Sequence, residues 1–180
     1  MKKIQLALLM MTMLLLGACS NNGANNEEKE QNKQDVSEES VGFSLMGDSI
    51  EEAENIPKEE KEQILQAFDT YISTFNEKEL DAYMETLSEN TESFDLEEER
   101  THTESIFKDY NLVREVSDVT IVKYSEAEAQ VFAVLKSSLK QLSTGLETSE
   151  NGRQVTVFTK ENNEWKVSSV HYLGDDAMKQ

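Results

Sequence analysis

The sequence has a single cysteine, Cys19, and only two histidines among its 180 residues. A lone cysteine cannot form an intramolecular disulfide. Two histidines and one thiol are also too few for the usual nitrogen and sulfur ligands of a zinc site. Glycine-rich phosphate loops, nucleophile elbows and paired-cysteine motifs are missing as well. We therefore expect no disulfide framework, no metal site, no cofactor and no catalytic residue that the sequence alone can assign.

Basic residues are scarce. Lysine and arginine together number 17, against 36 aspartates and glutamates, so the formal net charge is -19. Such an excess of carboxylates repels the phosphate backbone of nucleic acids. We therefore expect no nucleic-acid partner.

The sequence also lacks an apolar run long enough to cross a membrane, and its longest apolar run lies near the N-terminus. It spans Leu6–Ala18, is interrupted by Thr12, and follows Lys2 and Lys3. The run is shorter than the roughly 20 residues that cross a bilayer. A charged start, an apolar middle and a small-residue end are typical of a secretory signal peptide, so residues 1–18 are predicted to be one.

The signal ends in Leu16-Gly17-Ala18-Cys19, which resembles the lipobox of bacterial lipoproteins. The resemblance implies cleavage before Cys19, a diacylglyceryl group on its thiol, and a further acyl chain such as palmitate on the new amino terminus. Two or three acyl chains suffice for stable anchoring. It therefore predicts a lipid-anchored protein on the extracytoplasmic face of a bacterial cell membrane. The alternative is an ordinary signal peptide with a chance cysteine.

Residues 19–56 are predicted to be an acidic tether behind the lipidated cysteine. Ser20–Glu39 is rich in Asn, Glu, Gln and Ser and has almost no apolar side chains, a composition typical of disorder. About 35 flexible residues reach roughly 30 Å. We interpret the tract as a solvated spacer, with a cation-binding tail as the alternative. The apolar island Val41–Met46 either packs on the rim of the folded domain or docks a partner.

The folded domain is predicted to span residues 57–175, with a tail at 176–180. From Pro57 the apolar residues recur at helical spacing and form one stripe, which is typical of a helix with one buried face: Ile64, Leu65, Phe68, Tyr71, Ile72 and Phe75. Asn55 is the predicted cap of this helix. Asn76 and Glu79 have the spacing of a capping box for a second helix that ends near Leu87. A third helix is predicted over 95–110.

The pattern then changes to strands. Alternation predicts strands over 117–124, 127–139, 154–160 and 165–173, with a polar loop over 142–152. Three helices followed by four consecutive strands predict an α+β fold in which the helices pack on a curved, four-stranded antiparallel sheet.

This order of elements, the long first helix, the ENNEWKV turn at 161–167 and the final strand with His171 resemble one superfamily. It is the nuclear-transport-factor-2-like, ketosteroid-isomerase-like (SnoaL-like) superfamily, and the resemblance covers about residues 57–173. It implies a cone in which a strongly bent sheet wraps the long helix and can leave a cavity at the wide end.

Four residues are candidates for lining that cavity: Tyr71, Tyr83, Trp165 and His171. A tyrosine such as Tyr71 can donate a hydrogen bond into the cavity, as ketosteroid isomerase does, or it can be a core residue with a wet hydroxyl. His171 can be a general base or a structural histidine. His102, with Glu98 four residues earlier, supplies two potential metal ligands, which are not a site.

Two functions remain open at this point. The first is a non-catalytic, lipid-anchored module that binds a small apolar ligand or an envelope protein. The second is a small enzyme of isomerase, dehydratase or hydrolase type. We favour the first, because no aspartate–histidine pair of the kind that such enzymes place inside the cone can be assigned.

Overall fold

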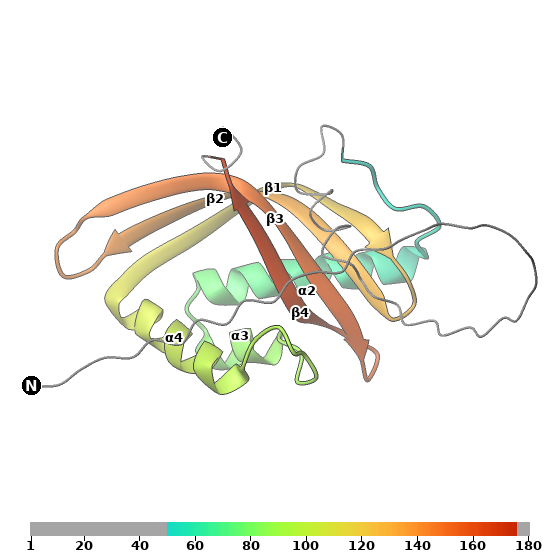
Figure 1. The fold of residues 1–180 in the computed structure, drawn as a ribbon, viewed down its shortest axis with the longest axis horizontal. Helices are drawn as coiled ribbons and strands as arrows, with labels where there is room; N and C mark the ends of the chain where they lie inside the picture. Colours follow the sequence, from blue (N-terminus) through green and yellow to red (C-terminus); the bar gives the residue numbers. More distant parts are fainter. Residues whose placement is uncertain (1–49, 176–180) are drawn as a thin grey trace, which may run out of the picture. The chain divides into compact units, whose positions relative to one another are not determined.

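The computed structural model of the chain describes residues 50–175 (Figure 1). The signal, Cys19, the acidic tract, Val41–Met46 and the tail at 176–180 lie outside the described residues, so the predictions about them stay predictions. The elements follow in the order α2 (Lys58–Asn76), α3 (Leu80–Glu85), α4 (Leu96–Asp109), β1 (Tyr110–Tyr124), β2 (Glu128–Gln141), β3 (Glu147–Glu161) and β4 (Glu164–Gly174). Within residues 50–175 this confirms the predicted order of three helices followed by four strands.

The strands form one antiparallel sheet in the order β1-β2-β3-β4. The sheet is curved, and α2 lies along its concave side together with α3 and α4 (Figure 1). The predicted apolar stripe of α2 faces this side: Ile64, Phe68 and Phe75 expose 2% or less of their surface. They pack against β2 and β3 residues such as Val131 and Phe158. The hydrophobic stripe therefore sets the face on which the sheet closes.

Two predicted caps are wrong. Asn55 has a positive φ of 59°, and Pro57 takes the N-cap position of α2 without a side-chain hydrogen bond. Glu79, which also lacks a capping bond, is the N-cap residue of α3. By contrast, the Asp95 side chain accepts hydrogen bonds from two backbone N–H groups at the start of α4, as expected for an N-cap aspartate.

Asn76 has another role. Its side-chain nitrogen donates to the carbonyl oxygen of Arg114 at 2.9 Å, and its side-chain oxygen accepts from the Arg114 N–H at 2.8 Å. The last residue of α2 is thereby fixed to the middle of β1. These two bonds hold the C-terminal end of α2 beside Arg114. They also fix the backbone from which the Arg114 side chain extends.

The sheet extends further than the apolar pattern predicts. β1 begins at Tyr110, and β3 begins at Glu147, within the predicted polar loop over 142–152. The first five residues of β3 are exposed, so they carry no apolar alternation. Their strand conformation comes from backbone pairing with β2, for example of Thr148 with Leu139.

An extra residue interrupts β4. Val167 pairs with Phe158 and Ser169 pairs with Val157, which leaves Ser168 unpaired in a β-bulge. Ser168 is fixed on both sides, because its carbonyl oxygen accepts from the Thr91 hydroxyl at 2.5 Å and its own hydroxyl donates to the Val157 carbonyl at 3.2 Å. The bulge reverses which side chains of β4 face α2.

Candidate functional site

A cavity of about 620 Å³ lies at one end of the concave side, among the helices, β1 and β4. Its walls combine aromatic and aliphatic groups with polar side chains in about equal measure: Tyr71, Phe75, Tyr83, Leu87, Ser93, Phe94, Glu99, His102, Thr103, Ile106, Arg114, Val167, Ser169, Val170 and His171. We call it the cone cavity. A cavity that joins apolar surface with convergent polar groups is a candidate small-molecule site.

The cavity contains three of the four predicted cavity residues, Tyr71, Tyr83 and His171. The fourth, Trp165, lines an open groove elsewhere. Tyr71 and Tyr83 are each 3% exposed, and their ring centroids lie 5.6 Å apart. Both tyrosines therefore belong to the core and to the cavity wall at once.

Tyr83 anchors a carboxylate in the cavity. Its hydroxyl donates to Glu99 Oε1 at 2.8 Å, and the buried Thr103 hydroxyl donates to the same oxygen at 3.2 Å. Burial, together with the charge of Glu99 and the proximity of Tyr71, raises the pKa of the Tyr83 hydroxyl far above its ordinary value. Tyr83 thus stays protonated and remains a hydrogen-bond donor to Glu99.

Arg114 supplies the positive charge of the cavity. Its guanidinium lies over the Phe75 ring, with 3.7 Å between Cζ and the ring centroid, and its Nη1 donates to the Tyr71 hydroxyl at 3.2 Å. Stacking on an aromatic face is a favourable position for a guanidinium. Asn76 fixes the Arg114 backbone, so both the backbone and the guanidinium of this residue are held in place.

The two histidines differ from a catalytic arrangement. His171 Nε2 lies 3.2 Å from the Ser169 hydroxyl, and the register pairs His171 with Val155, which belongs to the cluster on the other face of the sheet. The bulge at Ser168 therefore breaks the strand alternation between Val167 and His171. His102 is exposed on α4, and residues 50–175 contain no group of three or more potential metal ligands.

Trp165 belongs to a cluster near the start of α2. Its indole N–H donates to Glu60 Oε2 at 3.1 Å, while Lys160 Nζ binds Glu60 Oε1 at 2.5 Å and lies 5.3 Å from the indole centroid. The hydrogen bond from Lys160, opposed by partial burial and aided by the Trp165 bond, lowers the pKa of Glu60 below 4.5. This closed cluster joins α2 to the β3–β4 hairpin.

Glu60→Gln should therefore destabilise the protein in a pH-dependent way. Because the folded-state pKa of Glu60 is lowered, its charge stabilises the fold fully above about pH 4.5, and this contribution is lost as the pH falls through the folded-state pKa. We expect a loss of about 1–3 kcal/mol at pH 7. Urea unfolding at pH 7 and pH 3 checks this, with the exposed Glu59→Gln as control. An equal loss at both pH values would contradict it.

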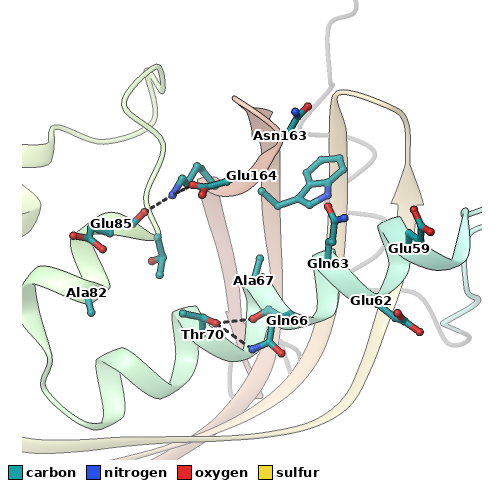
Figure 2. Close-up of a pocket in the computed structure, with 13 residues that line it drawn as sticks. Glu59, Glu62, Gln63, Gln66, Ala67, Thr70, Ala82, Glu85, Asn163 and Glu164 are labelled. Atoms are coloured by element: carbon teal, nitrogen blue, oxygen red, sulfur yellow. Dashed lines mark hydrogen bonds and ion pairs between the residues drawn. The ribbon is translucent and has the colours of Figure 1, made fainter.

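The groove that contains Trp165 is more open than the cone cavity (Figure 2). It has a volume of about 750 Å³ and runs between α2, α3 and the β3–β4 turn. Carboxylates and amides from these elements surround it, including Glu62, Gln66, Glu85, Asn163 and Glu164. Lys166 at its edge donates to the Glu85 carbonyl oxygen at 2.9 Å and pairs with Glu164 at 2.7 Å. Because this groove is the more open of the two, the cone cavity is the stronger candidate site.

Sequence reasoning missed Glu99 and Arg114. Glu99 lies on the helical stripe of Leu96, Thr103 and Ile106, where a charged residue among inward-facing neighbours is a usable signal. Arg114 alternates with Leu112 and Val116, both of which pack on the core. Recognising that strand before residue 117 would have placed the arginine on the concave face.

Three solved structures resemble the chain in fold. A ketosteroid isomerase-like protein from Erwinia carotovora atroseptica is 18% identical with a TM-score of 0.55, over 66% of this chain and 98% of that protein. A nuclear transport factor 2-like superfamily protein from Salmonella enterica serovar Typhimurium is 15% identical with a TM-score of 0.56, over 63% and 89%. A proposed dehydratase of the NTF2-like family from Streptomyces avermitilis is 12% identical with a TM-score of 0.56, over 65% and 97%.

At these identities the likeness shows the fold alone, and it confirms the predicted nuclear-transport-factor-2-like architecture. Sequence comparison finds no match among curated proteins. In the described part of the chain, no helix has the length and hydropathy needed to cross a membrane.

A family match covers most of the same residues. Residues 66–173, more than half of the chain, match the family described as the C-terminal domain of anti-sigma-I factor RsgI9. The match begins within α2 and ends in β4, so it includes every element that lines the cone cavity. The chain therefore belongs to the family of the C-terminal domain of anti-sigma-I factor RsgI9.

Proposed function

We propose that this protein is a lipid-anchored extracytoplasmic module whose cone cavity binds a small ligand with an apolar body, without chemical conversion. The observation that carries the proposal is the composition of the cavity. Aromatic and aliphatic groups form about half of its wall, and the polar groups Glu99, Tyr83, Tyr71 and Arg114 are held by hydrogen bonds and stacking. Such a wall buries an apolar ligand and orients it through a few polar contacts.

The location rests on the sequence and on the family. The Leu16–Cys19 box supports lipid attachment at Cys19, and a family named after a domain of an anti-sigma factor supports a regulatory role over a metabolic one. In this proposal the acyl chains on Cys19 hold the protein at the membrane. The acidic tract then separates the cone from the lipid surface.

Catalysis is the second candidate, because the fold also occurs in an isomerase-like protein and in a proposed dehydratase. One observation favours it: Glu99 Oε1 accepts both hydrogen bonds of the carboxylate, so the other oxygen could receive a proton from a ligand. Fold analogy carries little weight for function. Neither histidine of the cavity has a carboxylate among its hydrogen-bond partners within residues 50–175, so binding remains the better-supported function.

Filling the cavity mouth should weaken ligand binding at least tenfold. Val170 lines the cavity and is 40% exposed, so Val170→Trp would place an indole where the ligand enters. We expect the full chain in lipid nanodiscs to bind the neutral aromatic amide 2-naphthamide in isothermal titration calorimetry, and the Val170→Trp variant to show at least a tenfold weaker affinity.

The matched control is Val119→Trp. Val119 is a similarly exposed strand valine, 36% exposed, and does not line the cavity. Its variant should bind as the parent does, and empty nanodiscs give the blank for partition into lipid. Equal binding by the two tryptophan variants would show that the ligand enters elsewhere. A time-dependent change of a bound ligand would favour catalysis.

A further inference from the structure

The cone cavity contains a positive charge without a negative partner. The guanidinium of Arg114 stacks on Phe75 and donates to the Tyr71 hydroxyl. No carboxylate of residues 50–175 lies within ion-pair distance of it. In a chain with about twice as many acidic as basic residues, a cavity arginine without an ion pair is unexpected.

Tyr71 beside it has a free donor. Its hydroxyl accepts the hydrogen bond from Arg114, and no acceptor for its own hydrogen occurs among the described residues. The residue is 3% exposed and lines the cavity. A tyrosine hydroxyl can accept and donate at once, so its hydrogen remains available to a ligand oxygen.

We propose that the Arg114–Tyr71 pair is a carboxylate-binding subsite, and that the ligand of the cone cavity is an apolar-bodied carboxylate. This inference rests on the proposed binding function. The flat guanidinium leaves its edge N–H groups for the two oxygens of a carboxylate, a geometry that arginine matches well. Phe75 covers one face of the guanidinium, and the ring of Tyr71 is buried, so apolar surface adjoins these donors.

Glu99 determines the orientation of the ligand in the cavity. Tyr83 and Thr103 hold its carboxylate in the same cavity, where it repels a second carboxylate. An anionic ligand can therefore place its charged end only toward Arg114, and its apolar body then extends along the aromatic wall. A like charge that disfavours the reversed orientation contributes to specificity as much as the attractive contact does.

A matched pair of ligands tests the subsite. 2-Naphthoate and 2-naphthamide share one aromatic body and differ in the charge of the polar group. With the full chain in lipid nanodiscs we expect naphthoate to bind roughly 10- to 100-fold more tightly than naphthamide in calorimetry. In Arg114→Met this preference should fall below about twofold, because the variant loses more affinity for naphthoate than for naphthamide.

Two further variants keep the test decisive. Arg100→Met removes an arginine that is paired with Asp81 outside the cavity, so the preference should persist. If Arg114→Met fails to fold, Arg114→Lys retains the charge without the planar fork and should reduce the preference severalfold. Equal affinity of the parent for both ligands would overturn the carboxylate subsite and leave the binding function standing. Binding of neither ligand would overturn both.

Discussion

Replacing Phe68 with alanine should lower the free energy of unfolding by about 3–5 kcal/mol. Phe68 lies in the middle of the α2 stripe, exposes 2% of its surface, and belongs to the cluster formed by α2 and the concave face of the sheet. Removing its ring leaves a cavity that the surrounding strands cannot fill, because each of them is paired to a neighbour. The lost contacts and the residual cavity both add to the cost.

Urea unfolding followed by circular dichroism measures this loss. Leu146→Ala is the control, since Leu146 is 65% exposed in the loop between β2 and β3, and it should change stability by less than about 0.5 kcal/mol. If the two variants unfold at the same urea concentration as the parent, the α2 stripe does not form the core.

Replacing Cys19 with alanine should release the protein from the membrane fraction. In the lipoprotein proposal, the thiol of Cys19 is the atom to which the diacylglyceryl group is attached, and no other cysteine can replace it. Without acyl chains the acidic mature part, with 36 acidic against 15 basic residues after removal of residues 1–18, is repelled by anionic lipid. Fractionation followed by immunoblotting should show a nearly complete shift.

Ser20→Ala provides the control, because it changes the neighbouring residue and leaves the thiol intact. Mass spectrometry of the amino-terminal peptide should find a diacylglyceryl cysteine in the parent and in the control. An unmodified Cys19, or a Cys19→Ala variant that stays with the membrane, would contradict lipid anchoring.

The sequence predicts the core of this fold well where burial is one-sided. The α2 stripe could be read directly, because one face of a long helix contacts the sheet and the other contacts water. Residues 147–151 could not be read as a strand, because that part of β3 is exposed and extends only through backbone pairing with β2. The predicted caps at Asn55 and Asn76 were wrong for a related reason. Polar residues near helix ends suit several roles, and tertiary contacts decide among them.

The site was partly predictable. Tyr71 and Tyr83 could be chosen because a tyrosine on an apolar helical face buries its ring while its hydroxyl still needs a hydrogen-bond partner. Glu99 and Arg114 could not be chosen by the same rule, because charged residues usually mark the wet face. Their inward placement depends on partners distant in sequence, such as the Asn76 side chain that fixes Arg114.

The unpaired Ser168 also has a consequence for how such a protein can change over time. Because β4 alternates its faces on either side of this bulge, loss of a single codon there would exchange the two sets of side chains that follow. Leu173 and Tyr172 would then exchange the faces of the sheet on which they lie, with the preceding hairpin unaltered. One small deletion or insertion at an edge strand could therefore give related proteins different polar groups at the same wall while their folds remain superimposable.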